Sequence, residues 1–237
     1  MRPISQRAAG CAVARPPDRT HHRGRTRCRR ATTRLARLIA AIVAGGASRR
    51  FGGAPKGLLE VGGRRIIDRI ANALSKVATE IVIVSNADEA GEWIPGARVV
   101  HDVRRERGSL VGIHSAIASA GAPVLVVAWD MPFLTSELLR VIRDRALDAE
   151  FAAVPRGPRG PHPLCAAYTT ACLPTIEASL DMKDLRVMAM LDRLPSVDYI
   201  DGAALLATAR AEHVFFNVND AEDLAVARAM AESSAID

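Results

Sequence analysis

Apolar residues recur with two different periods from residue 38 onward. Four short runs are apolar on both faces, as is typical of strands buried inside a sheet, and they span 38–44, 80–85, 97–102 and 123–130. The segments between them have the period of amphipathic helices, and in 64–76 this period places Ile67, Ile70 and Leu74 on one face. Buried strands that alternate with helices predict an α/β fold, a Rossmann-like, mostly parallel sheet with helices on both faces.

The helix boundaries are marked by residues that start or stop helices. A helix is predicted for 110–120, closed by Gly121, and another for 136–147, capped by Thr135. The second half is less regular but contains further elements. We expect two strands joined by a Pro/Gly/Arg loop in 151–168, two helices in 171–193, a strand at 196–200, and a strand after His213 that leads into the terminal helix. Because no linker separates these elements, they are expected to extend the same sheet, giving one domain over 38–237.

Ligands of such sheets bind beyond the carboxyl ends of the strands. The residues that follow the predicted strands are therefore the candidates for chemistry: 45–56, Ser85, Asn86, Asp102, Asp130 and 217–219. Two acidic residues, Asp102 and Asp130, each end a strand, and Mg²⁺ prefers such oxygen ligands. The alternative reading of Asp130 is an ordinary turn residue before Pro132.

The glycine-rich stretch "AIVAGGASRRFGGAPKG" at 41–57 follows the first strand. It matches neither the P-loop nor the G-x-G-x-x-G fingerprint. Glycines nevertheless let backbone N–H groups approach an anion, and Arg49, Arg50 and Lys56 supply charge that suits a triphosphate. The alternative is a glycine turn with solvated arginines. A basic loop and two acidic strand ends that face one crevice favour a metal–triphosphate complex.

Charge is distributed unevenly along the chain. The whole chain has a net charge of +6, yet residues 1–37 hold 11 arginines against the single acid Asp18, a net of +10. Residues 38–237 hold 21 Lys+Arg and 25 Asp+Glu, a net of −4. The N-terminal extension 1–37 is poor in large apolar residues, which predicts disorder. A transit peptide, a nucleic-acid-binding arm and a translation start further in, for instance at Leu35, are the alternatives. The acidic remainder makes nucleic acid an unlikely partner.

Two further features concern the compartment. No apolar run approaches the roughly 18–20 residues of a membrane-spanning helix, so no membrane association is expected. The four cysteines form no C-x-x-C pair, which favours a reducing, cytoplasmic location.

Several segments together resemble the molybdenum cofactor guanylyltransferases, a family of nucleotidyltransferases with a glycosyltransferase-A-type fold. The likeness covers about 38–230 and is carried by "VAGGASRRFGGAPKGLLEVGG", "GSLVGIHSAI", "WDMPFL", "PHPLCAAYTTACLPTIEASL" and "FFNVNDAEDL". The resemblance implies transfer of GMP from GTP to the terminal phosphate of molybdopterin with Mg²⁺ as cofactor and release of pyrophosphate. It also implies that a partner protein delivers molybdopterin or receives the product.

Roles follow from the resemblance position by position. Residues that match the nucleotide-binding set are Val43, Ala44, Gly45, Gly46, Lys56, Asn86, Asp102 and Asp130. Among these, Lys56 matches the triphosphate-binding lysine and Asp130 the metal ligand, and with Arg50 they form the predicted catalytic set. Asn217 and Asn219 match an N-x-N pair near molybdopterin or the metal, and Arg186 matches one arginine of a pair; all three are predicted to bind the molybdopterin substrate. The asparagine match falls on Asn86 or one or two positions earlier.

The chain departs from the family pattern at three positions. Pro55 replaces an aspartate before the lysine, Trp129 replaces a small residue, and Leu185 replaces one arginine of a pair. A Pro-Lys pair is familiar in cytidylyltransferases of the same superfamily. The alternative function is therefore transfer from CTP or another nucleotide, to molybdopterin or to a sugar phosphate.

Overall fold

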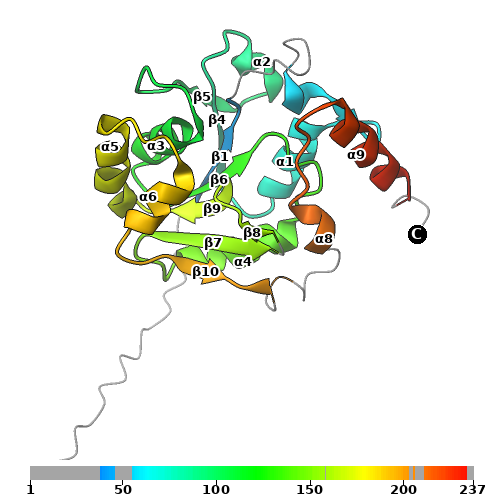
Figure 1. Ribbon diagram of the computed structural model, residues 1–237. Coiled ribbons are helices and arrows are strands. Elements are labelled where there is room, and N and C mark those ends of the chain that lie inside the picture. The colour runs from blue at the N-terminus through cyan, green and yellow to red at the C-terminus, as the bar shows by residue number, and fades with distance from the viewer. Residues whose placement is uncertain (1–37, 46–54, 158, 203–204, 206–210, 234–237) are drawn as a thin grey trace, which may run out of the picture. The chain divides into compact units, whose positions relative to one another are not determined.

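The computed structural model describes residues 38–45, 55–157, 159–202, 205 and 211–233, all within the compact unit that spans 36–237. Its centre is a mixed sheet in the order β10-β7-β9-β6-β1-β4-β5, with β8 paired to β7 (Figure 1). The strands are β1 (Ile39–Val43), β4 (Glu80–Val84), β5 (Arg98–Val100), β6 (Val124–Ala128), β7 (Ala152–Gly157), β8 (Gly160–Pro161), β9 (Cys165–Tyr168) and β10 (Asp198–Ile200). The apolar runs of the sequence thus become the predicted strands.

Strand β1 lies at the centre of a parallel set. It pairs in parallel with β4 and β6, and Val43 lies opposite Val84 on one side and Ala128 on the other. The three strands therefore end at the same level, so the residues that follow them meet at one edge. This carboxyl edge is where the sequence places its candidate residues.

Strand β9 runs against this direction. It is antiparallel to both β6 and β7, whereas β7 and β10 are parallel to each other. Since β9 begins at the edge where β6 ends, its approach brings the preceding residues to that edge, and Ala128 N donates to Leu164 O at 2.8 Å. The direction of β9 therefore adds residues 161–164 to the site.

Helices cover both faces of the sheet, as predicted. They are α1 (Ile66–Leu74), α2 (Ala90–Trp93), α3 (Ser109–Ala120), α4 (Ser136–Ala146), α5 (Leu173–Asp181), α6 (Val187–Arg193), α8 (Ala211–Val214) and α9 (Ala221–Ser233). Short 3-10 turns occupy η2 (Lys56–Leu58) and η3 (Thr170–Cys172). Figure 1 shows α3, α5 and α6 together on one side and α1 and α9 on the other.

Alternate side chains of β1 pack into two hydrophobic cores, one on each face of the sheet. Ala40 and Ile42 pack with buried residues of α1 and α4, whereas Ala41 and Val43 pack with those of α3, α5 and α6. Both sets are buried, which explains why the run lacks the polar alternation of a half-exposed strand.

Two predicted helix ends are confirmed. Leu138 N donates to Thr135 Oγ1 at 3.3 Å, so Thr135 caps α4. Gly121 closes α3 with φ of 58°, a left-handed conformation that glycine adopts without a steric penalty.

Two of the predicted elements differ in the structure. Residues 64 and 65 belong to a hairpin of β2 (Glu60–Val61) and β3 (Arg64–Arg65), because Gly62 and Gly63, with φ of 58° and 69°, form its turn. The strand expected after His213 is wrong. α8 ends at Val214, and the irregular segment that follows bonds to the sheet edge through Val218 N, which donates to Asp130 O at 2.9 Å.

Within the described ranges, every helix is too short or too polar to cross a bilayer.

Candidate functional site

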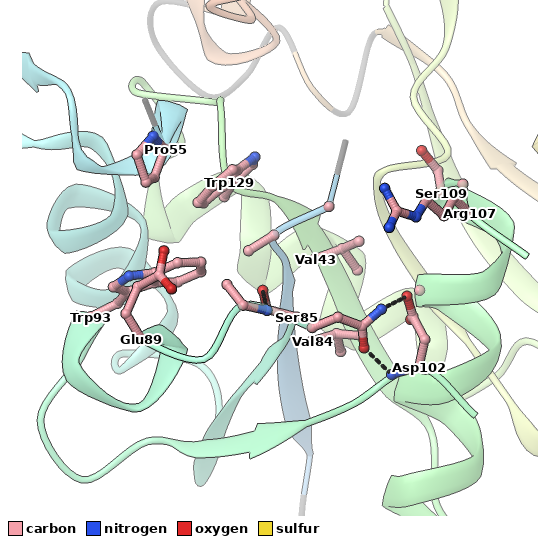
Figure 2. A pocket seen from close by; sticks show the side chains of 16 residues that line it. Val43, Pro55, Val84, Ser85, Glu89, Trp93, Asp102, Arg107, Ser109 and Trp129 are labelled. Atoms are coloured by element: carbon pink, nitrogen blue, oxygen red, sulfur yellow. Dashed lines mark hydrogen bonds between the residues drawn. The ribbon is translucent and has the colours of Figure 1, made fainter. Parts of the chain in front are cut away.

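A pocket of about 590 Å³ opens at the carboxyl edge, above β1 and β4. The predicted residues Val43, Ala44, Gly45, Asn86 and Asp102 all line it. Figure 2 shows Glu89 and Trp93 on one side of this first pocket and Asp102, Arg107 and Ser109 on the other, with Val43 and Ser85 between them.

Asn86 and Asp102 hold each other in place within this pocket. Asn86 Nδ2 donates to Asp102 Oδ2 at 2.8 Å, and Asp102 N donates to Asn86 Oδ1 at 2.9 Å (Figure 2). Ser115 Oγ of α3 lies 3.3 Å from Asp102 Oδ1, as a further donor. The parallel pairing of β4 and β5 brings these two strand ends together, which is why residues 16 positions apart form one unit. Both side chains are oriented before any ligand binds.

A second pocket of about 380 Å³ adjoins the first. The two share Val43, Gly45, Ser109 and Trp129 in their linings. The second also contains Asp130, Asn217 and Asn219, so three more predicted residues lie together. The bond from Val218 N to Asp130 O brings the two asparagines to this edge.

Asp130 has an uncompensated carboxylate oxygen. Its Oδ1 is buried and makes no hydrogen bond in the structure. Burial raises the pKa of this carboxyl, while the positive charge of Lys56 lowers it and the negative charge of Asp223 raises it. Lys56 therefore lies close enough to Asp130 for their charges to interact. A buried oxygen without a partner is a group that a cation would satisfy.

The arrangement fits a magnesium ion held partly by substrate. Among the described residues, no group of three or more His, Cys, Asp and Glu side chains is placed to hold a metal. Mg²⁺ commonly uses only one or two carboxylates together with substrate phosphates and water. Asp130 supplies an oxygen ligand of that kind.

A third pocket of about 240 Å³ continues from the second. Both contain His162, Asn217 and Asn219, and the third adds Arg159, Phe215, Phe216 and Asp223. The His162 ring stacks on Phe215, with centroids 3.8 Å apart and planes 7° apart. Burial, and then the charge of Arg159, lowers the pKa of His162, which favours a neutral imidazole.

Arg186 is paired with an acidic neighbour on the surface. It precedes α6, its side chain is 78% exposed, and Asp184 accepts bonds from its Nε at 2.9 Å and its Nη2 at 3.0 Å. It lines none of the three pockets described above. Gly46 and Arg50, also predicted for the site, lie outside the described residues.

Several residues that line these pockets were not predicted as site residues from the sequence. They are Glu89, Trp93, Arg107, Arg159 and His162. Arg107 directly precedes Gly108, the residue before α3. Its position between a predicted strand and a predicted helix could have placed it at the carboxyl edge of the sheet. His162 lies in a segment that carries the family resemblance, but its place in the site depends on the direction of β9.

Comparisons with known proteins agree with this architecture. Residues 40–197 match the model of the MobA-like NTP transferase domain. A probable molybdenum cofactor guanylyltransferase of Pelotomaculum thermopropionicum is 42% identical over 194 residues, which are 81% of this chain and 93% of that protein. The molybdenum cofactor guanylyltransferase of Desulfosudis oleivorans is 36% identical, over 82% of this chain and 96% of that protein.

A solved structure has the same fold. Molybdopterin-guanine dinucleotide biosynthesis protein A from Archaeoglobus fulgidus superposes with a TM-score of 0.72 and is 26% identical, over 82% of this chain and 99% of that one. The resemblance read from the sequence motifs is thereby confirmed. The chain is a nucleotidyltransferase that belongs to the MobA-like family, among the molybdenum cofactor guanylyltransferases.

Proposed function

We propose that this protein transfers GMP from GTP to the terminal phosphate of molybdopterin, forming molybdopterin guanine dinucleotide and releasing pyrophosphate. The observation that carries the proposal is the buried, partnerless Oδ1 of Asp130, in a pocket that adjoins the first pocket and contains Asn217 and Asn219. The relatives named guanylyltransferases support GTP as the donor.

The first pocket receives the nucleoside in this proposal. Its volume of about 590 Å³ lies within the range of small-molecule sites. The fixed Asn86–Asp102 pair offers amide and carboxylate atoms to the base and ribose. Lys56 neutralises charge on the triphosphate and on the departing pyrophosphate.

The second and third pockets receive molybdopterin. Asn217 and Asn219 provide amide donors and acceptors there, and Arg159 provides a positive charge. The acceptor phosphate has a second pKa of about 6 and is mostly ionised near neutral pH, so it attacks the α-phosphorus without a general base. The described residues therefore act by alignment and by neutralising charge.

Asp130 would hold the magnesium ion. When bound, the ion would neutralise charge on phosphate oxygens. The protein's part is to offer Oδ1 from a buried position without a competing hydrogen bond.

The proposal includes a cytoplasmic location and protein partners. Cys165 and Cys172 are free and buried, which suits a reducing compartment. A partner that delivers molybdopterin, or a molybdoenzyme that accepts the product, belongs to the same proposal.

Selectivity among nucleotides tests the donor. Thermal unfolding is measured with GTP, CTP, ATP and UTP, each with Mg²⁺, and GTP is expected to stabilise the protein most. A ligand at 100 times its Kd contributes about 2.7 kcal/mol to the free energy of unfolding. Pyrophosphate release is then followed with the stabilising nucleotide and molybdopterin.

The outcomes separate the two candidate donors. A larger stabilisation by CTP would replace the guanylyl assignment with a cytidylyl one, as Pro55 in the first pocket would allow. Lys56→Ala is expected to weaken GTP binding, whereas Lys76→Ala, an exposed lysine beyond α1, is the matched control and should leave it unchanged.

A further inference from the structure

Trp129 connects the two groups to which the proposed function assigns the triphosphate and the metal. It directly precedes Asp130, and it lines both the first and the second pocket. Its ring also lies against Gly57, the residue that follows Lys56. One residue thus touches the turn that carries Lys56 and shares a peptide bond with Asp130.

The contact with Gly57 is too close for any side chain. A Cβ built on Gly57 would lie 2.7 Å from Trp129 Cε3, 3.1 Å from Cδ2 and 3.3 Å from the carbonyl oxygen of Trp129. Gly57 does not have a positive φ, so its backbone conformation alone would accept alanine. The ring of Trp129 is therefore what requires glycine at this position.

The ring of Trp129 also packs against a second tryptophan. Its centroid lies 5.2 Å from that of Trp93, with planes 30° apart. Trp129 is only 6% exposed and Trp93 4%. Because so little of the Trp129 ring is accessible, it has little surface on which a base could stack. Its contact with Gly57 instead supports the neighbouring turn.

The turn that rests on this ring is short and hydrogen-bonded. Leu58 N donates to Pro55 O at 3.0 Å, and Leu59 N donates to Lys56 O at 3.1 Å. A shift of Gly57 away from the ring would therefore move Lys56 with it. The charge of Lys56 acts on Asp130, so such a shift changes the distance between the two groups.

We propose that Trp129 is a positioning residue that sets Lys56 relative to Asp130 through its contact with Gly57. The inference rests on the proposed function of Lys56 as a triphosphate ligand. It assigns to Trp129 a role in placing charge for the phosphates of the donor nucleotide.

A double-mutant cycle between Gly57 and Trp129 tests the inference. Gly57→Ala forces the turn away from the ring and is expected to lower kcat/KM for GTP by about 10²-fold, the effect of an error of about 1 Å in placement. Trp129→Val removes the ring, so adding Gly57→Ala to it should cost much less. Residues in contact show such non-additivity.

Binding of inorganic tripolyphosphate with Mg²⁺, measured by calorimetry, separates positioning from folding. Gly57→Ala should weaken this binding at a temperature well below its own melting temperature, where the variant is folded; some loss of stability is expected because the added methyl group overpacks the contact with Trp129. Gly91→Ala in α2, where a Cβ meets nothing within 4 Å, is the matched control and should bind as wild type does.

Each outcome has one meaning. Equal losses from Gly57→Ala in the wild-type and Trp129→Val backgrounds would overturn the inference, as would tripolyphosphate binding unaffected by Gly57→Ala. If Lys56→Ala also leaves tripolyphosphate binding unchanged, the role proposed for Lys56 fails with it. Since tripolyphosphate carries no base, a wrong assignment of GTP would leave this test unaffected.

Discussion

Among single residues, Asp130 shows most clearly how this protein trades stability for a site. A half-buried carboxylate whose Oδ1 has no hydrogen-bond partner destabilises the folded state when ionised. The raised pKa of Asp130, caused first by burial, expresses the same cost. Residues that violate the usual rules of packing in this way concentrate at functional sites.

Replacing Asp130 with asparagine should therefore stabilise the protein above acidic pH. A carboxyl with a raised folded-state pKa binds more protons when folded, so wild-type stability falls as pH rises from the ordinary value of 3.8 through the raised one. Asp130→Asn does not titrate there. The melting temperature of Asp130→Asn should equal that of wild type at pH values below 3.8 and exceed it most at pH values above the raised pKa. Each kcal/mol of added stability raises the melting temperature by about 2–4 °C for a chain of this size.

Thermal unfolding of both proteins between acidic and neutral pH checks this prediction. In the wild-type protein, Mg²⁺ should increase the stabilisation that GTP provides. In Asp130→Asn this increase should be lost. If Asp130→Asn is less stable than wild type at neutral pH, the attraction between Lys56 and the Asp130 carboxylate outweighs the cost of burying that carboxylate.

At the level of elements, the sequence predicts what depends on local patterns. Buried strands such as β1 and β6 follow from continuous apolar runs, and the α4 boundary follows from Thr135. The carboxyl ends of parallel strands share an edge, so Asp102 and Asp130 could be assigned to that edge from the sequence, although the structure places them in two adjoining pockets.

Features that depend on long-range pairing were not predicted. The run that forms β9 contains no sign of its antiparallel direction, which is decided by its neighbours β6 and β7. Although His162 lies in a segment that carries the family resemblance, neither it nor Arg159 was predicted as a site residue. The segment after Val214 is apolar enough for a strand but is irregular in the structure, and Val218 N donates to Asp130 O at the sheet edge.

The cap of α4 provides a test of a locally encoded feature. Thr135→Ala removes the acceptor for Leu138 N and should lower the free energy of unfolding by about 1 kcal/mol. Thr135→Ser keeps the hydroxyl and should retain most of that stability. Urea unfolding measures both, and pyrophosphate release should be unchanged because Thr135 lies outside the three pockets of the site. Equal losses in the two variants would assign the effect to the methyl group.

For the whole molecule, the electrostatic character of the chain and that of its catalytic part differ in sign. The net charge of +6 comes from the arginines before residue 38, whereas the three pockets lie within a part of the chain whose net charge is −4. The match to the MobA-like domain begins at residue 40, after that basic extension. Transfer of GMP is therefore expected to depend on residues after the extension, and any binding of nucleic acid on the extension itself.

Removing residues 1–35 tests this division of roles. The deletion leaves Leu38, whose carbonyl oxygen accepts bonds from Thr79 N and Thr79 Oγ1, at 3.0 and 3.2 Å. It removes ten arginines and Asp18, which changes the net charge from +6 to −3. GTP-dependent stabilisation and pyrophosphate release should match those of the full chain. If the full chain is retained on immobilised RNA or DNA in a salt-sensitive way, the deletion should abolish that retention. A shortened chain that folds but no longer releases pyrophosphate would place part of the catalytic function in the extension.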